Sequence, residues 1–379
     1  MKKQYTPTLA DSICNPRTRK IKKQFFKQLT TLIDWQQIQS MINDYDQRGR
    51  KSVGNLAHDG LVLFKMCLLQ TWYGLSDYEI EDQVNDRLSF SSFCGLSIDS
   101  VAPDHSTLSR FRSSMSQLGV YEKLLQLIND QLEKHQFLVK QGAIVDASVI
   151  PTPLKPKGKP TYVHVDEPTD NTAIDVASKP LKQPIAKKTN QQDPKSCKTT
   201  TAINQSATAL KRVVSQGVDQ QATWLKKGNK AYYGYKKHVI TNQEGLVLGL
   251  VTTPANVHEI TNLEKVLSTT SLPENIPIKA DKGYSSKKNR DLLKASKLQD
   301  HIMHKATPKQ PLSDEQLKLN RLISKTRYKI ERTFGSIKRW FHAGVARYRG
   351  INKMHTQNLL EAISYNLYRI PGIIMSNKQ

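Results

Sequence analysis

Short apolar runs alternate with helical patterns between residues 138 and 340, and this order constrains the fold more than any other feature of the sequence. The run AIVDASVI follows Gly142 and predicts a strand. YYGYKKHVI and LVLGLVTT flank the turn TNQEG and predict a β-hairpin. IPIKA at 276–280 and DHIMH at 300–304 predict two further strands, with helices expected over 256–267 and from about Ser286. This alternation indicates an α/β fold.

The clearest helix prediction runs from Ser313 to about Trp340. Ser313 and Gln316 form a capping box, and two acids follow in the first turn. On a helical wheel, five apolar side chains fall within about 60° of one another and are expected to face the core: Leu319, Ile323, Ile330, Phe334 and Ile337. Arg327, Glu331 and Lys338 form a second line about 75° away. A row nearly opposite the apolar stripe is expected in solvent: Arg321, Lys325, Arg332 and Arg339.

Residues 29–137 predict an all-α region. The segment Leu61–Gly74 is apolar nearly all round, which indicates a central buried helix ended by glycine. Ser76 is expected to cap the next helix, and another helix is expected near Ser106. The side chains Ser109, Arg110 and Arg112 on that helix are compatible with a helix-turn-helix, while the net acidity of the region favours packing or dimerisation equally.

The remaining segments complete the domain prediction. Residues 151–230 are polar and show little periodicity, which indicates a largely irregular insertion with a helix over 207–216. A final amphipathic helix is expected from Met354 to Ile370, ending at Pro371-Gly372. We therefore expect a basic arm (1–28), a helical N-terminal domain (29–137), an α/β domain (138–352) that contains the insertion (151–230), and a C-terminal helix and tail (353–379).

The charge distribution indicates which class of partner the chain binds. The chain has 57 Lys and Arg against 33 Asp and Glu, a net charge of +24, which favours an anionic partner, nucleic acid before membrane. Eighteen basic and five acidic residues between 282 and 349 give +13, residues 1–28 have +7, and residues 29–137 have −5. The alternative is a basic surface that serves solubility alone.

Other classes of protein are not expected from this sequence. No apolar run is long enough to span a membrane, and the first residues lack the apolar core of a signal peptide. The four cysteines, Cys14, Cys67, Cys94 and Cys197, lie far apart without a CxxC pair. They predict neither a zinc site nor a disulfide framework, and they fit a reducing cytoplasm.

Three carboxylates are placed by secondary structure where they could act together. Asp146 interrupts an apolar strand, Asp281 directly follows another, and Glu331 lies at the edge of the buried face of the long helix. Two aspartates and one glutamate form an oxygen-ligand set that suits Mg²⁺ or Mn²⁺. Each has an ordinary alternative: an aspartate that closes a strand is often a turn former or helix cap, and Arg327–Glu331 fits a simple i,i+4 ion pair.

These motifs resemble the DDE transposases of bacterial insertion sequences, most closely the insertion-sequence-five type, over residues 30–370. IVDASVI is similar to the first-aspartate motif and ADKGYSS to the second. The third motif of the family is Tyr-x2-Arg-x3-Glu-x6-Lys, whose spacing Arg327, Glu331 and Lys338 match, while Ser324 stands at the tyrosine position. Tyr328 is not expected on that face, and Glu259 in TPANVHE stands where an aspartate is expected.

The resemblance implies a ribonuclease-H-like mixed sheet flanked by helices, with the first and fourth strands adjacent. It implies an enzyme that cleaves the ends of a mobile DNA element and transfers the strand to target DNA, with Asp146, Asp281 and Glu331 as catalytic ligands of two Mg²⁺ or Mn²⁺. We expect Arg327 and Lys338 to contact DNA phosphates or to orient Glu331, and we expect DNA contacts from five further cations: Arg321, Lys325, Arg332, Arg339 and Lys282. Tyr284 and Asn256 are weaker candidates for the rim of the site, and His238 and His258 are expected to be structural.

Further expectations concern partners and competing functions. We expect double-stranded DNA as partner, a homodimer or higher oligomer on DNA, no membrane association, and a cytoplasmic bacterial protein associated with the nucleoid. Two alternatives remain: a DNA-binding or repressor derivative without chemistry, and a ribonuclease-H-like nuclease that cuts without joining.

Overall fold

The computed structural model describes residues 20–48, 56–157, 161–165, 209–213, 217–306 and 311–376. The chain forms two compact units, one of residues 1–155 and 219–379 and one of residues 156–218. In the second unit, β2 (Thr161–Val165) pairs with β3 (Ala209–Val213) in antiparallel register. The helix predicted over 207–216 is therefore wrong where the structure describes it. A partner strand satisfies the backbone of 209–213, and such tertiary pairing overrides local helix propensity.

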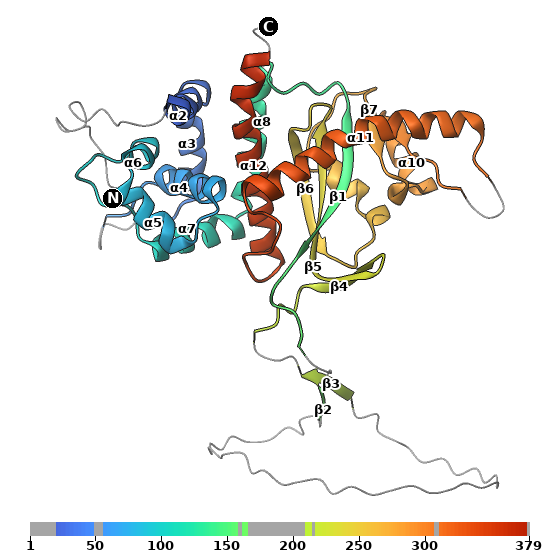
Figure 1. Ribbon diagram of the computed structural model, residues 1–379, viewed down its shortest axis with the longest axis horizontal. Coiled ribbons are helices and arrows are strands. Elements are labelled where there is room, and N and C mark those ends of the chain that lie inside the picture. Colours follow the sequence, from blue (N-terminus) through green and yellow to red (C-terminus); the bar gives the residue numbers. More distant parts are fainter. Residues whose placement is uncertain are drawn as a thin grey trace, which may run out of the picture. The chain divides into compact units, whose positions relative to one another are not determined.

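The helical prediction for residues 29–137 is confirmed over 29–48 and 56–137, the parts that the structure describes. The helices are α2 (Lys20–Leu32), α3 (Trp35–Tyr45), α4 (Gly60–Tyr73), α5 (Asp77–Asp86), α6 (Leu88–Cys94), α7 (His105–Gln117) and α8 (Val120–Lys134). Helix α4 is buried on nearly every side and contacts α3, α5, α6 and α7 (Figure 1). Gly74 ends it with φ +69°, a conformation that glycine adopts without strain. Ser76 caps α5 in a capping box with Glu79, as predicted.

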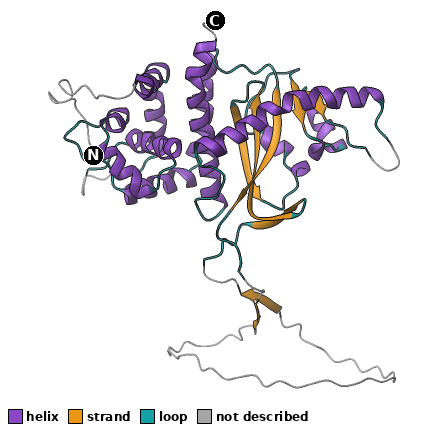
Figure 2. Ribbon diagram, viewed as in Figure 1, coloured by secondary structure: helices purple, strands orange, loops and turns teal. Residues whose placement is uncertain are grey.

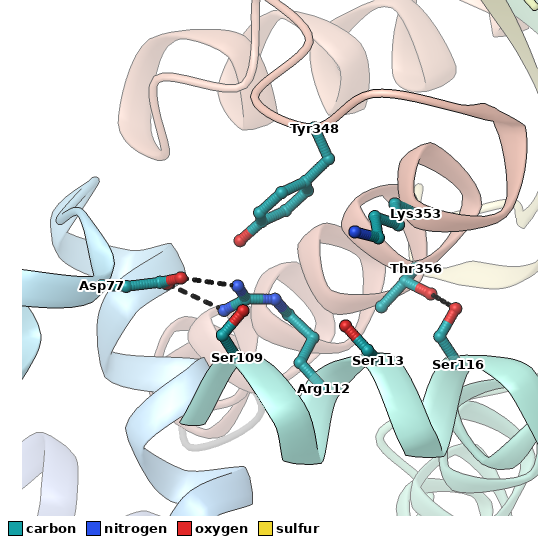
Figure 3. A pocket seen from close by; sticks show the side chains of 8 residues that line it. All are labelled: Asp77, Ser109, Arg112, Ser113, Ser116, Tyr348, Lys353 and Thr356. Atoms are coloured by element: carbon teal, nitrogen blue, oxygen red, sulfur yellow. Dashed lines mark hydrogen bonds and ion pairs between the residues drawn. The ribbon is translucent and has the colours of Figure 1, made fainter. Parts of the chain in front are cut away.

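Of the two alternatives left open for α7, packing is the one that Arg112 supports. The side chain of Arg112 is only 7% exposed and donates to both carboxylate oxygens of Asp77, at 2.9 and 2.8 Å. Its guanidinium also lies 4.6 Å from the centre of the Tyr348 ring, within a pocket of about 120 Å³ (Figure 3). Arg112 therefore joins the N-terminal helices to the segment before the last helix and is not available to read DNA bases, whereas Arg110 is exposed.

A mixed sheet follows the helices. Its strands are β1 (Ala143–Pro151), β4 (Thr223–Lys227), β5 (Lys230–Asn242), β6 (Val247–Pro254), β7 (Pro277–Ala280) and β8 (Gln299–Ile302). The order is β4-β5-β1-β7-β8, with β6 paired to β5. The β5–β6 hairpin is antiparallel as predicted, β5 is antiparallel to β1, and β7 and β8 run parallel to β1. A first strand between an antiparallel hairpin and parallel strands makes this a ribonuclease-H-like sheet.

Two local predictions beside the sheet need adjustment. Strand β4 gives regular structure to part of the stretch 151–230, where we expected little. The helix predicted over 256–267 is instead a 3₁₀ turn, η1 (Glu259–Thr261), followed by the short α9 (Leu263–Leu267). Asn256 stays outside the helix because its amide N–H donates to the Thr223 hydroxyl and its side chain accepts from the same group. The 3₁₀ turn η2 (Lys282–Tyr284) and α10 (Lys287–Ala295), capped by Ser286, follow β7 as expected.

The two long C-terminal helices cover the sheet (Figures 1 and 2). Helix α11 (Asp314–Trp340) has the predicted capping box and contacts β1, β7 and β8. Helix α12 (Ile351–Ser376) packs against β6 and also against α4, α7 and α8. Residues 356–367 are all buried, so the amphipathic prediction is wrong: both faces of α12 have packing partners.

The predicted end of α12 is also wrong. The helix continues through Pro371 to Ser376, because Ile373 packs against the core and holds the last turn in place. The cost of Pro371 is the hydrogen bond that its missing N–H would donate. Among the helices of the described ranges, none is long and apolar enough to cross a membrane.

Candidate active site

The sheet register places the two predicted aspartates side by side. Val145 of β1 pairs with Ala280 of β7, and the two strands are parallel. Asp146 and Asp281 each follow one member of this pair, so they continue from neighbouring strands at the same level. Asp146 accepts from the Ala147 amide at 2.8 Å, and Asp281 caps η2 by accepting from the Lys282 amide at 2.8 Å. The backbone therefore fixes both carboxylates.

Arg327 joins these aspartates to Glu331. Its Nη2 lies 2.9 Å from Oδ2 of Asp146 and 3.7 Å from Oε1 of Glu331, so the two oxygens are within 6.6 Å of each other. Its Nη1 lies 3.3 Å from Oδ1 of Asp281. One guanidinium thus contacts carboxylates from β1, from the end of β7 and from α11, and the three acids predicted from sequence lie around it. We expected Arg327 to contact DNA phosphates or to orient Glu331; in the structure its guanidinium contacts all three carboxylates.

Exposure increases from the floor of this site to its mouth. The side chain of Asp146 is 12% exposed, that of Asp281 27% and that of Glu331 61%. Asp146 lies within the sheet, Asp281 in a turn at its edge, and Glu331 on the helix that covers it. A ligand would therefore meet Glu331 first and Asp146 last.

Burial and the charge of the ion-pair partner shift the pKa values of Asp146 and Arg327 in opposite directions. Burial raises the pKa of the Asp146 carboxyl above its ordinary value, Arg327 opposes this rise, and the negative charge of Asp281 adds to it. Burial alone would lower the pKa of Arg327, but the surrounding carboxylates raise it on balance. The Nε of Arg327 is buried and has no hydrogen-bond partner in the described part of the chain. The guanidinium is therefore held by its two terminal nitrogens.

A buried layer of side chains lies behind the acids. Tyr284, expected at the rim, is instead fully buried, and its hydroxyl lies 3.4 Å from Nδ1 of His238. Burial raises the pKa of Tyr284 well above its ordinary value, and the charges of Glu259, Asp146 and Asp281 contribute to the rise. His238 also bonds the Thr253 hydroxyl, at 3.0 Å, which fits the predicted structural role.

Sequence reasoning missed two lysine–glutamate pairs next to this layer. Lys237 of β5 and Glu361 of α12 are 2.9 Å apart and almost wholly buried. Lys236 points to Glu259, with Nζ and Oε1 3.6 Å apart. The adjacent lysines in an otherwise apolar strand were the available signal, but the partners lie 124 and 23 positions away. Only the folded sheet shows which acid each lysine meets.

The predicted DNA contacts have different surroundings. Lys338 is half-buried; burial lowers its pKa, and the charges of Lys237 and Lys227 lower it further. Four cations of the α11 row are exposed as predicted: Arg321, Lys325, Arg332 and Arg339. Arg332 also donates to the Glu244 carbonyl oxygen at 3.2 Å. Lys282 is exposed beside Asp281, and Asn256 bonds Thr223 away from the acids.

The donor set fits a hard divalent cation. All three candidate ligands are carboxylates, which Mg²⁺ and Mn²⁺ prefer. In the described ranges, no three His, Cys, Asp or Glu side chains converge closely enough to hold a metal as they stand. The positive charge among Asp146, Asp281 and Glu331 is the guanidinium of Arg327, which contacts all three carboxylates.

Comparison with known proteins finds two transposase families and a transposase relative. Residues 138–367 match the family described as transposase DDE domain, and residues 16–114 match a family described as transposase domain (DUF772). The transposase for insertion sequence element IS1106 of Neisseria meningitidis serogroup B is 34% identical over 262 residues, which cover 69% of this chain and 76% of that protein.

Two solved structures also align with the chain, both at 12% identity. They are the crystal structure of the Mos1 strand transfer complex, with a TM-score of 0.18, and the Mos1 transposase paired-end complex with left transposon end, with a TM-score of 0.19. The alignments cover 91% and 98% of this chain and 85% and 93% of those chains. Scores this low say nothing about a shared arrangement.

Proposed function

Because this chain belongs to the DDE transposase family, we propose that Asp146, Asp281 and Glu331 are the acids with which it cuts the ends of a mobile DNA element and joins them to target DNA. One observation supports this assignment above the others: carboxylates from three separate elements surround a single guanidinium. An isolated turn former or surface glutamate would have no reason to share a cation with two other acids 50 or more positions away.

DDE transposases use divalent metals and bind DNA. We propose that Asp146, Asp281 and Glu331 hold Mg²⁺ or Mn²⁺. The chemistry that such ions supply when bound is activation of a water or a 3′-hydroxyl and stabilisation of the leaving oxygen of a phosphodiester.

The side chains themselves contribute position and charge. The backbone bonds of Asp146 and Asp281 fix their carboxylates at the sheet, so substrate approaches a rigid floor. Glu331, the most exposed of the three, lies on the side from which DNA can enter. Arg327 balances the negative charge of the site and presents a planar guanidinium that suits phosphate as well as carboxylate. The exposed cations of α11 and Lys282 would hold flanking duplex through its phosphates, which position DNA but do not specify its sequence.

The assembly follows from the same proposal. An element has two ends, and each end requires an acid site, so we propose a homodimer or larger oligomer on DNA. The matched relative is bacterial, and we propose action on nucleoid DNA in a bacterial cytoplasm. The mass of the complex with end DNA, measured by light scattering, tests the oligomer: one protein chain per two ends would contradict it.

The catalytic test compares wild type with Asp146→Asn, Asp281→Asn and Glu331→Gln on DNA that carries the element's inverted repeats. We expect Mg²⁺-dependent nicking and strand transfer in wild type and loss of both in each variant, with DNA binding retained. Glu315→Gln, an exposed acid in the first turn of the same helix, is the matched control and should keep full activity. Unimpaired cleavage by Asp146→Asn would refute the acid assignment, and cleavage without joined product would indicate a nuclease.

A further inference from the structure

The hairpin formed by β4 and the first residues of β5 has a surface that the acid site does not explain. Its turn is Gly228-Asn229, and Gly228 has φ +60°. A Cβ added to Gly228 would meet nothing within 4 Å, so the turn lies in open space. Residues 226–231 are all exposed. The hairpin therefore extends beyond the packed part of the sheet.

Three lysines concentrate positive charge at this tip. They are Lys226, Lys227 and Lys230, and none of them forms an ion pair with a described residue. Lys227 and Lys230 are direct cross-strand partners, an arrangement in which like charges repel. No Asp or Glu occurs between residues 220 and 243. Nothing on the hairpin offsets this charge.

An exposed aromatic side chain accompanies the lysines. Trp224 is 48% exposed, and its ring centre lies 5.2 Å from that of Tyr233, its cross-strand partner. An exposed aromatic ring on a short edge strand offers an apolar face that a ligand can cover. Aromatic side chains interleaved with cations are typical of surfaces that bind nucleic acid.

The charge at the hairpin tip also acts on a lysine of α11, the helix that carries Glu331. The charge of Lys227 contributes to the lowered pKa of Lys338, on the last turns of α11. Lys237 contributes as well, but its charge is matched by Glu361. An anion placed between the hairpin tip and Lys338 would relieve this repulsion.

We propose that the hairpin of residues 223–234 is a second DNA-binding element, which holds the phosphates of duplex DNA bound at the acid site through Lys226, Lys227 and Lys230. The inference rests on the proposed function for its partner, because charge complementarity identifies a polyanion and the family identifies that polyanion as DNA. The contact is with phosphates and is therefore independent of sequence.

The test uses the full chain and fluorescein-labelled duplex DNA of random sequence, over a series of salt concentrations. In the triple variant Lys226→Gln/Lys227→Gln/Lys230→Gln, we expect weaker binding and a salt slope that falls by about 0.9 for each lysine removed. The matched control, Lys134→Gln/Lys265→Gln/Lys294→Gln, removes the same charge from exposed positions on α8, α9 and α10 that form no ion pair with a described residue, and it should keep the wild-type slope. An unchanged slope in the triple variant, or an equal change in the control, would overturn the proposal.

Tryptophan fluorescence gives a second, local readout. Of the four tryptophans, Trp35 and Trp72 are buried, so Trp224 and Trp340 are the exposed ones. Trp340 adjoins Arg339, one of the cations proposed to hold DNA, so the test uses Trp340→Phe, in which Trp224 is the one exposed tryptophan. DNA should quench the emission of Trp340→Phe, and an emission that DNA leaves unchanged would contradict the contact. A triple variant that binds DNA normally but self-associates would show instead that the lysines protect an edge strand, which also overturns the proposal.

The outcomes separate this inference from the proposed function. Asp146→Asn should bind the random duplex like wild type and should not cleave element ends. If wild type cleaves and joins DNA but the hairpin variants bind normally, only the hairpin inference fails. If the hairpin variants lose affinity while wild type shows no cleavage, only the catalytic proposal fails.

Discussion

Replacing Arg327 by methionine removes the cation that the three acids share, and its cost can be worked from the contacts. The bond to Asp146 joins two side chains that are 18% and 12% exposed. Removing one member of such a buried pair leaves the other charge without a partner, which costs about 3–5 kcal/mol. The contact with Asp281 is longer, and that with the 61% exposed Glu331 is worth at most about 1 kcal/mol. Burial already raises the pKa of Asp146, so in the variant this carboxyl can take up a proton and become neutral. Its protonation limits the loss of stability. We expect Arg327→Met to lower the free energy of unfolding by about 2–4 kcal/mol.

A double-mutant cycle in urea at neutral pH tests this reasoning. In the Asp146→Asn background no buried carboxylate is left without a partner, so Arg327→Met should cost about 1 kcal/mol. Arg321→Met, at an exposed position of the same helix, is the control and should cost less than about 0.5 kcal/mol. Added Mn²⁺ should raise the free energy of unfolding of Arg327→Met more than that of wild type, because the ion replaces the lost positive charge. Equal costs of Arg327→Met in both backgrounds would refute the shared-cation argument.

Two further predictions concern the layers behind the site. Burial lowers the pKa of His238 from 6.5 to about 4. Between these two pH values the imidazole is therefore protonated in the unfolded chain and neutral in the folded chain. Stability should fall as the pH drops from 6.5 to about 4, by on the order of 3 kcal/mol, and urea titrations of His238→Gln should lack this loss; an unchanged pH profile would contradict it. Asn366 donates to the Val247 carbonyl at 2.7 Å and accepts from the Val247 amide at 2.8 Å. Asn366→Leu should therefore cost about 3 kcal/mol in the same measurement, against less than about 0.5 for the exposed Asn352→Leu; similar costs would show that these bonds contribute little.

The elements around the site were predictable because local rules decide them. The capping box at Ser313 fixes the start of α11, and its apolar spacing fixes the face toward the sheet. The strands that position Asp146 and Asp281 are short apolar runs, which are recognisable before any contact is known. That the two aspartates become neighbours could not follow from local rules. Their residues are 135 positions apart, and the resemblance to a known family supplied the pairing of the strands.

Where prediction failed, the deciding contacts lie far away in sequence. Helix α12 was expected to expose its polar face, but Glu361 meets Lys237 and Asn366 meets the backbone of β6. Each polar side chain is acceptable inside because a specific distant group satisfies it. For Arg112 the sequence left DNA reading and packing equally open, and the distant Asp77 that holds its side chain decides for packing. Composition shows how polar a helix is, but it does not show whether its polar groups have partners in the protein.

Arg327 illustrates both points, because the sequence placed it correctly on α11 and gave Glu331 as a partner but could not give Asp146 and Asp281. As an i,i+4 neighbour of Glu331 it would form an exposed pair of little energetic consequence. In the folded chain its shortest bond is to Asp146 of β1, at 2.9 Å, and its contact with Glu331 is the longest of the three. The guanidinium therefore balances the charge at the floor of the site and leaves Glu331 the acid most accessible to an incoming cation. If the site binds metal and DNA as we propose, it can remain folded before either binds, since its buried carboxylate already has a partner.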